Sequence, residues 1–570
     1  MVMKEVNPFK SSSKAARKSV LKLLLAAGLL ILLNIVSSYV FFRLDLTSDK
    51  RYKLSESSKQ LATELKDVVY FKIYLDGDIP PGFRRLKNAT REMLDEFKVY
   101  AGDHIEYEFV DPSANVDDKE RNQVYKQLNE KGLTPTQLES REKGSRSQYL
   151  IFPGAIVSHG SQEIPVQLLK SRIGSNADAM LNSSIENLEF EIATTLRKLS
   201  TPVAKRVGFL RGHGELNTRQ ITDAARALSD FYRVDTVNIE GKLGALSEHE
   251  ALIIAKPQES FSEKDKFILD QYIMKGGKVL WLIDKMQISM DSLMASNTNV
   301  ALPLELNLDD QLFNYGVRIN NDLLMDLQAA PIPVVTGYVG NQPKQDLFPW
   351  YYFPLLTPQS KHPVVNNLNA IKAEFISSLD TIETNSVKKT ILLTSSEFSR
   401  VQMPPARVSL NILESEPDPK LFNKKQIPVA VLLEGNFRSA FRNRIPQEIR
   451  DSPEIDYSEN SAFTKMIVIS DGDIIASHVS KRGTIFPLGF DRYTQQNYGN
   501  KNFILNCMDY LLDETGILEL RGKEFKMRML DPTKVKDAGM LKWMNVILPV
   551  LLIAVYGLIR NAMRRRKYAK

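Results

Sequence analysis

Two uncharged apolar segments lie near the two ends of this chain, and the long stretch between them mixes polar and apolar residues. The first segment runs from Leu23 to Phe42 and the second from Trp543 to Ile559. A helix needs about 20 residues to cross the ~30 Å hydrocarbon core of a bilayer, and about 17 is the lower limit. The pattern therefore predicts two transmembrane helices, over residues 20–42 and 543–559.

Basic residues flank the outer side of each apolar segment. They are Lys10, Lys14, Arg17 and Lys18 before the first, and Arg560, Arg564, Arg565, Arg566 and Lys567 after the second. Because basic flanks stay in the cytoplasm, both termini (1–19 and 560–570) are expected inside and the body in the periplasm of a bacterial inner membrane. The alternatives are a signal peptide for the first segment and a buried helix for the second. Span length and the basic tail favour anchors.

The first part of the body reads as an α/β layer. Apolar and β-branched runs predict strands, and helical spacing of apolar residues predicts helices between them. The strands are expected at 68–75, 105–110, 148–153, 155–159 and 163–168, and the helices at 86–100 and 119–129. This order resembles a thioredoxin-like domain (67–183) behind a stalk (43–66). Asp76–Gly77–Asp78 stands where that fold carries reactive cysteines, so the layer is expected to be redox-inactive.

A second α/β unit follows a predicted connecting helix (184–201). Strands are expected at 206–210, 234–238, 251–255 and 278–283, with helices at 219–229 and 262–274. Strands that alternate with helices predict a parallel, doubly wound sheet, here within a domain over 202–532. An irregular insertion is expected over about 286–450, and a linker over 533–542. Asp471–Gly472–Asp473 resembles a fragment of a calcium loop, and a hairpin turn is favoured.

Composition removes several functional classes. The chain has 570 residues, a formal charge of +7 and one cysteine, Cys507. Much of the positive charge belongs to the cytoplasmic flanks, so no nucleic-acid binding is predicted. A single cysteine excludes an internal disulfide, a CxxC pair and a thiolate zinc site. No phosphate loop occurs, so any ATP hydrolysis belongs to a partner, and no cofactor is predicted.

The run Arg211–Gly212–His213–Gly214–Glu215 most resembles a site, because it directly follows a predicted parallel strand. Open α/β sheets bind ligands beyond the carboxyl ends of their strands. His213 and Glu215 have the chemistry of an acid, a base or a metal ligand. The alternative is a tight structural turn. No HxH, HxxH or HExxH pattern supplies further ligands, so the run is interpreted as a ligand or partner contact, with no catalytic or metal role.

The first predicted span carries residues suited to packing against another membrane helix. Gly28 and Asn34 are small and polar, respectively, and both kinds of residue support helix contacts in lipid. The alternative is that they face lipid.

Three segments of the body resemble a known family. They are Val207–Glu215, Ala251–Ile283 with its Gly276–Gly277 turn, and Asn502–Leu512. They resemble the auxiliary family of ABC-type transport systems, and in particular the gliding-motility-associated components of Bacteroidetes. The resemblance implies a GldF-like permease, a GldA-like ATPase, and a role in gliding or secretion. The second domain also resembles the class I glutamine-amidotransferase fold, but Cys507 lies on a late helix and not at a nucleophile elbow.

Three functions follow from these observations, in order of support. The first is a non-enzymatic auxiliary subunit of an ABC transporter complex, whose periplasmic body couples to partners. The second is a periplasmic module that binds a small ligand or a protein near Arg211–Glu215. The weakest is a metal-dependent hydrolase that uses His213 and Glu215.

Overall fold

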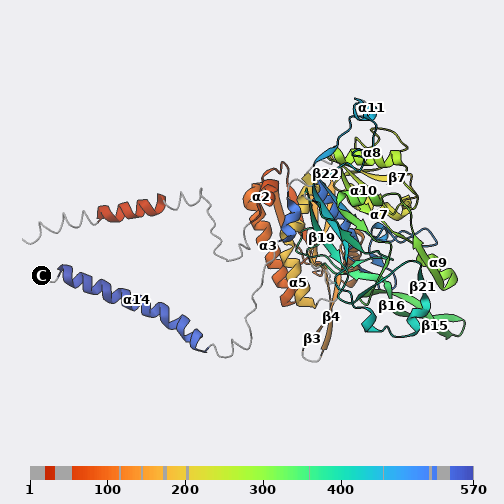
Figure 1. Cartoon of the computed structure of the whole chain (residues 1–570). Helices are drawn as coiled ribbons and strands as arrows, with labels where there is room; N and C mark the ends of the chain where they lie inside the picture. Colours follow the sequence, from red (N-terminus) through yellow and green to blue (C-terminus); the bar gives the residue numbers. More distant parts are fainter. Residues whose placement is uncertain are drawn as a thin grey trace, which may run out of the picture. The chain divides into compact units, whose positions relative to one another are not determined.

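The structure is a computed structural model of the whole chain (Figure 1). It describes residues 20–32, 54–114, 117–142, 145–170, 176–200, 204–358, 360–384, 386–453, 455–512, 516–522 and 539–568. Two units are distinguished, Met1–Lys53 and Leu54–Lys570, and each is treated by itself.

Apolar helices are present in both terminal regions. Val20–Leu32 is a short apolar helix, and its Gly28 is exposed with open space around the position of a Cβ. The rest of the predicted first span, including Asn34, lies outside the described residues. Helix α14 (Gly539–Tyr568) is longer than the predicted second span. Among the described residues, its Trp543–Arg566 part is the one stretch long and apolar enough to cross a membrane, with a mean hydropathy of 2.0.

The body begins with a four-stranded mixed sheet in the order β2-β1-β5-β6. Its strands are β1 (Val69–Ile73), β2 (Ile105–Phe109), β5 (Gly154–His159) and β6 (Gln162–Gln167). Strand β2 runs parallel to β1, whereas β5 is antiparallel to β1 and to β6. This order is compatible with the thioredoxin-like description, which stays a prediction.

Three details of this layer differ from the sequence expectation. Helix α3 (Pro81–Ala101) starts five residues early, because Pro81 occupies the first helical position, where a missing N–H costs nothing. Strand β4 (Ser145–Ile151) lies outside the four-stranded sheet and pairs with the unexpected strand β3 (Thr136–Glu142) in a separate two-stranded sheet. The expected connecting helix is two helices, α5 (Ala177–Glu186) and α6 (Leu188–Ser200), separated at Asn187. Helices α2 (Glu56–Thr63) and α4 (Asp118–Glu130) complete the layer.

A seven-stranded sheet forms the centre of the second part, in the order β19-β22-β23-β10-β9-β7-β8. The bounds are β7 (Arg206–Arg211), β8 (Arg233–Asn238), β9 (Ala251–Ala255), β10 (Lys278–Leu282), β19 (Val387–Thr394), β22 (Pro428–Arg438) and β23 (Asn460–Ile469). The five neighbouring strands β8, β7, β9, β10 and β23 run parallel to one another, as expected. Beyond these parallel strands, β22 and β19 add an antiparallel edge for which the sequence analysis predicted no direction.

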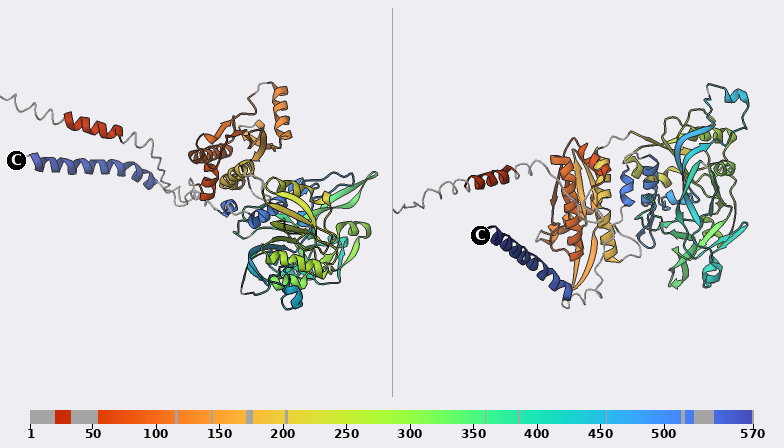
Figure 2. Two further views of the ribbon diagram at one scale, coloured as in Figure 1. Left: turned by 90° about the horizontal axis from the view of Figure 1, so that it is seen from above. Right: turned by 60° about the vertical axis from the view of Figure 1, so that its left-hand side comes forward.

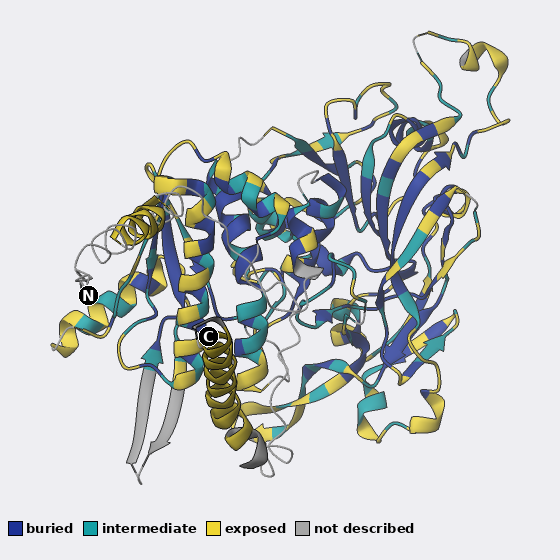
Figure 3. Ribbon diagram, turned by 90° about the vertical axis from the view of Figure 1, so that its left-hand side faces the viewer, coloured by how far each residue is buried: buried dark blue, intermediate teal, exposed yellow. Residues whose placement is uncertain are grey.

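Both faces of this sheet are covered, and the strand sequences show why. All five residues of β9 are buried. Ala251, Ile253 and Ala255 belong to one core cluster, and Leu252 and Ile254 to a second cluster on the opposite face. Helices α7 (Thr218–Ser229) and α12 (Asn500–Leu512) contribute to the first cluster, and α8 (Glu263–Met274) and α10 (Asp309–Tyr315) to the second. Figure 3 shows the strands as largely buried.

The insertion expected to be irregular is rich in β-structure (Figure 2). It has a core of its own. The aromatic run at residues 350–353 lies in the long strand β16 (Gln342–Leu356), which pairs with β15 (Ala329–Val339), and Trp350 is fully buried. The insertion also contains β11 (Met286–Gln287), α9 (Met290–Ser296), β12 (Thr298–Pro303), β13 (Val317–Ile319), β14 (Leu323–Asp326), β17 (Ile371–Lys372), β18 (Leu379–Thr381), β20 (Ser399–Gln402), β21 (Ala406–Ser409) and α11 (Gln447–Arg450). Strands β24 (Phe490–Asp491) and β25 (Gln496–Asn497) follow it.

Candidate functional site

The predicted site run lies at the carboxyl end of β7, and its backbone requires its two glycines. Gly212 and Gly214 have φ values of 111° and 75°, in the region that favours glycine. A Cβ on Gly214 would lie 3.1 Å from the Cβ of Gln258. The chain therefore turns sharply after β7 and passes close to the loop that follows β9.

His213 lies inside this turn between two carboxylates. Its Nδ1 is 3.1 Å from Glu215 Oε1, and its Nε2 is 3.4 Å from Asp265 Oδ2. The imidazole stacks on Phe261 with ring centroids 3.7 Å apart. His213 is 5% exposed and the Glu215 side chain 2%. The structure thus brings the two predicted residues together, with both imidazole nitrogens already engaged by protein oxygens.

The same turn connects strands β7 and β9 and helix α8. The carbonyl of His213 accepts hydrogen bonds from the N–H groups of Gln258 and Glu259, each at 2.9 Å. Leu216 N donates to Ala255 O at 3.1 Å. Asp265, in the first turn of α8, accepts from Gly241 N at 2.8 Å through Oδ1. This closed network gives the turn the geometry of a structural staple between β7, β9 and α8.

Two further side chains belong to the surroundings of this turn, Arg211 and Asp265. Arg211 Nη1 donates to the carbonyl of Leu216, and its Nη2 is buried without a hydrogen-bond partner in the described part of the chain. Sequence reasoning missed Asp265 as a partner of His213. The available signal was its place three residues after the capping Ser262, since helix N-termini collect carboxylates.

A second cluster of charges lies at the carboxyl ends of the neighbouring strands β9, β10 and β23. Lys256 Nζ is 3.0 Å from Asp284 Oδ2 and 2.5 Å from Asp473 Oδ2. Asp471 is fully buried, and its Oδ1 and Oδ2 accept from the N–H groups of Asp473 and Glu374. The hairpin turn expected at Asp471–Gly472–Asp473 is wrong, because the 3-10 helix η4 (Asp473–Ile475) follows β23 there.

Burial and proximity perturb the acids of this cluster. Burial, together with Asp473 and Asp284, raises the pKa of Asp471 well above its usual range. Burial also raises the pKa of Asp473 to about 7, although Lys256 acts against the rise. Burial opposes the charged form of Lys256, but Asp284 and Asp473 together raise the pKa of its amine. The ionisation of this cluster, which lies where three strand ends meet, is therefore sensitive to pH.

The three carboxylates of this cluster are the described residues whose chemistry suits a cation. Oxygen atoms from Asp284, Asp471 and Asp473 lie within 4.8 Å of one another. Hard cations such as Ca²⁺ take oxygen ligands of this kind, but they need about six or more. Lys256 already contacts two of the three carboxylates. Its ammonium supplies the positive charge that such a group of acids requires.

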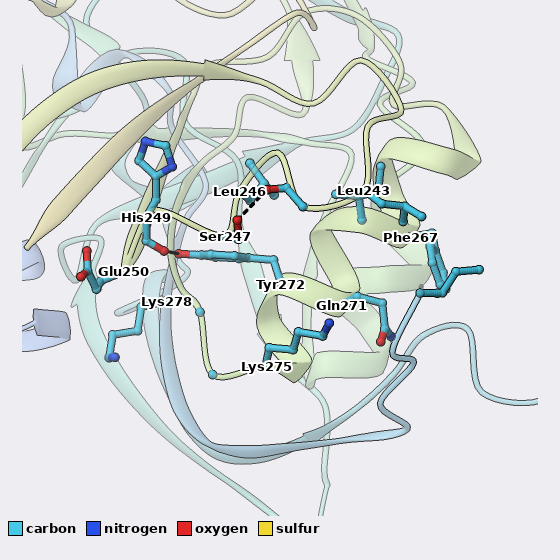
Figure 4. Close-up of a pocket in the computed structure, with 15 residues that line it drawn as sticks. Leu243, Leu246, Ser247, His249, Glu250, Phe267, Gln271, Tyr272, Lys275 and Lys278 are labelled. Atoms are coloured by element: carbon cyan, nitrogen blue, oxygen red, sulfur yellow. Dashed lines mark hydrogen bonds between the residues drawn. The ribbon is translucent and has the colours of Figure 1, made fainter. Parts of the chain in front are cut away.

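A cleft of about 500 Å³ opens at the opposite, amino-terminal edge of the parallel strands (Figure 4). Tyr272 reaches from α8 toward the backbone of His249 and donates to its carbonyl at 3.1 Å. Gly277 permits this packing, since a Cβ there would lie 2.3 Å from the Tyr272 ring. The lining includes the apolar Leu243, Leu246, Phe267 and Ile455, and the basic Lys275 and Lys278.

The chain combines a doubly wound body with a helix that is long and apolar enough to cross a membrane. A family model described as an ABC-type uncharacterized transport system matches residues 204–507, and the chain belongs to this ABC transport auxiliary family. A domain of unknown function matches residues 48–158. This second match coincides with most of the four-stranded layer.

Two individual proteins are similar to the chain. An uncharacterized protein of Borreliella burgdorferi is 22% identical over 568 residues, which cover 97% of this chain and 99% of that protein. The solved structure of the mmIFT52 N-terminal domain is 13% identical and has a TM-score of 0.31. That alignment covers 54% of this chain and 96% of the solved domain.

Proposed function

We propose that this chain is a non-enzymatic auxiliary subunit of an ABC transporter complex of the GldG kind, as found in gliding motility or secretion. In this proposal it sits in the bacterial inner membrane with both termini in the cytoplasm and the body in the periplasm. Membership of the ABC transport auxiliary family supports the auxiliary role. The charged flanks of the two apolar segments support the orientation.

The observation that carries the non-enzymatic role is the closed geometry around His213. A general base must reach a substrate proton, directly or through one water. His213 has one carboxylate at each ring nitrogen, a phenyl ring on its face and 5% exposure. The weaker hydrolase alternative would need this staple to open.

The proposed partners are a GldF-like permease, a GldA-like ATPase and the lipid bilayer. Gly28 and Asn34 are proposed contacts of the first span with a permease helix, and Arg211–Glu215 is proposed to organise a surface for a periplasmic protein or small ligand. In the same proposal, 67–183 is a redox-inactive thioredoxin-like layer. The strand order β2-β1-β5-β6 supports it, and the single cysteine of the chain, Cys507, lies elsewhere.

A ligand-binding role has one specific observation in its favour. The cleft beside Tyr272 combines apolar walls with the basic Lys275 and Lys278 at its border. An apolar lining with a few charged groups, here also including Glu250, is typical of small-molecule pockets. Its position at the amino-terminal edge, away from Arg211–Glu215, separates this candidate from the predicted site.

Co-purification tests the main proposal. The tagged full-length chain, extracted from membranes in mild detergent, is expected to retain an ABC permease and an ATPase, identified by mass spectrometry. Replacing the first span by a poly-Leu anchor should keep the chain in the membrane and weaken this recovery, because small and polar contacts are lost. Recovery of neither subunit with the unmodified chain would contradict the proposal.

A parallel assay tests the absence of catalysis. The purified chain is expected to hydrolyse no amide, ester or phosphate substrate above background, and His213→Ala should change nothing. Hydrolysis that disappears in His213→Ala, in a variant with an unchanged melting temperature, would establish the hydrolase alternative.

A further inference from the structure

Helix α6 is buried on nearly all sides, which is unusual for a helix between two parts of a chain. Its buried residues include the charged Glu189 (4% exposed) and Arg197 (9% exposed). A helix without a solvent-facing side belongs to the interior of a fold. Elements from both ends of the body pack around it, namely α2, α3 and the 3-10 helix η5 (Ile517–Gly522).

The first of these contacts reaches the segment that follows the predicted first span. Glu189 Oε1 accepts hydrogen bonds from Ser55 N at 2.7 Å and from Ser58 Oγ at 2.9 Å. Ser55 is the N-cap of α2, and Ser58 is fully buried. Leu54, the first residue of the body, is packed in the same apolar core as Leu188. The body therefore begins with its backbone held by a charged group of α6.

The second contact reaches the segment that precedes the predicted second span. Ile517, Leu518 and Leu520 of η5 are buried in the core that includes α6. At the start of η5, a Cβ on Gly516 would lie 3.3 Å from Ser57 Oγ. The two segments that lead toward the predicted spans thus meet each other as well as α6.

The other end of α6 connects to the central sheet. Arg197 Nη2 is 2.8 Å from Asp509 Oδ1 on α12, and Tyr232 donates to the same oxygen at 2.7 Å. The Arg197 guanidinium also lies over the Phe231 ring, 4.7 Å from its centroid. Helix α12 packs against α7, β10 and β23. Displacement of α6 would therefore reach the strands that carry the buried charge cluster.

We propose that α6 is the mechanical junction of the protein, where both membrane-leading segments join and from which their movement passes to the seven-stranded sheet. Glu189 is the positioning residue on the membrane side and Arg197 on the sheet side. The junction is rigid, since apolar packing surrounds both polar contacts. Movements of the membrane subunits therefore tilt the body as a whole. This inference deepens the proposed function, and its coupling to ABC subunits rests on that proposal.

Hydrogen exchange of the full-length protein in detergent tests the membrane side. Glu189→Ala removes the acceptor of two hydrogen bonds, one of them buried, and we expect exchange to rise about tenfold or more in both α2 and η5. Glu189→Gln keeps an acceptor oxygen and should restore protection. Helix α8, which is outside the junction, serves as the internal control. Faster exchange in α2 with η5 unchanged would overturn the junction.

A disulfide tests the direct meeting of the two segments independently. The Cβ position of Gly516 and Ser57 Oγ are close enough for Ser57→Cys with Gly516→Cys to approach disulfide geometry. Native Cys507 is buried and will not compete. Gly516 has a φ of 72°, so a cysteine there is strained equally in this pair and in the pair of exposed Thr63→Cys with Gly516→Cys. Mild oxidation should therefore cross-link the Ser57→Cys pair much more completely than the Thr63→Cys pair. Equal yields of the two pairs would show a loose contact and refute the rigid junction.

The failure of this inference can be distinguished from the failure of the proposed function. If exchange and cross-linking give the expected results but no ABC subunits are recovered, the junction is supported and the proposed function is contradicted. If the ABC subunits are recovered but exchange in α2 and η5 changes independently, the proposed function is supported and the junction is contradicted. In the assembled complex, oxidation of the Ser57→Cys, Gly516→Cys pair should leave ATPase activity unchanged. Reversible loss of that activity would mean that the junction must open.

Discussion

Asp473 should make the stability of the protein depend on pH in an unusual direction. Its carboxyl has a pKa raised by burial to about 7, compared with about 3.9 for an unfolded aspartate. A raised acid binds its proton more tightly in the folded state. Its contribution to stability is therefore most favourable at low pH and is lost as pH rises through 7.

The size of the effect follows from linkage between these two pKa values. Between pH 6 and pH 8 the folded carboxyl loses its proton, whereas the unfolded one is ionised throughout. The integrated difference is about 1.4 kcal/mol in favour of pH 6. The side chain is 18% exposed and forms an ion pair with Lys256, so we expect about 1 kcal/mol. In a body of this size that corresponds to a melting-temperature shift on the order of 2 °C.

Comparison of variants isolates this contribution from other titrating groups. Burial lowers the pKa values of His362 and His478, so each imidazole binds its proton less tightly in the folded state than in the unfolded state. The contribution of these two residues to stability therefore falls as pH drops below about 6.5. We expect Asp473→Asn to remove the Asp473 contribution and leave the histidine contribution, so that the difference between variant and wild type changes by about 1 kcal/mol from pH 6 to pH 8. Urea unfolding of the full-length protein in detergent measures it, with the exposed Asp103→Asn as control. Parallel pH profiles for Asp473→Asn and wild type would refute the reasoning.

Three further predictions concern packing and topology. Gly277→Ala should lower the unfolding free energy by about 1–3 kcal/mol, because a Cβ there meets the Tyr272 ring at 2.3 Å. Gly337→Ala, with open space around its Cβ position, should be near neutral in the same denaturation assay. Arg197→Ala should cost about 3–5 kcal/mol in the same denaturation assay, because it leaves a buried carboxylate without its cation. Reporter fusions at the C-terminal end and at Asn341 should report opposite compartments, and matching compartments would exclude the two-span topology.

The elements that could be predicted from sequence are those whose own residues carry the signal. Strand β9 is a short, wholly apolar run, and the Gly276–Gly277 pair marks the end of α8 just before β10. Strand β3 carries mostly polar residues, so periodicity did not reveal it. The direction of β22 was also unreadable, because a buried strand has the same composition whether it runs parallel or antiparallel.

The candidate site was predictable to a similar extent. His213 and Glu215 are neighbours in sequence, so their contact in a tight turn could be expected. Lys256, Asp284 and Asp473 come from the ends of three different strands, and only the order of strands in the sheet brings them together. No local pattern contains that order. Clusters that depend on sheet topology are therefore invisible to motif reading, even when every participating residue is charged.

The enclosure of α6 also determines how the protein can be divided. A fragment that ends before residue 188 would leave α2 without Glu189, and one that begins at residue 204 would leave Asp509 without Arg197. Neither half has a complete interior of its own, because residues of both belong to one apolar cluster. Cutting the chain after Ser200 should therefore yield two incomplete pieces with matching surfaces. Co-expressed, they are suited to reassembly as a split protein whose signal reports the integrity of the body in living cells.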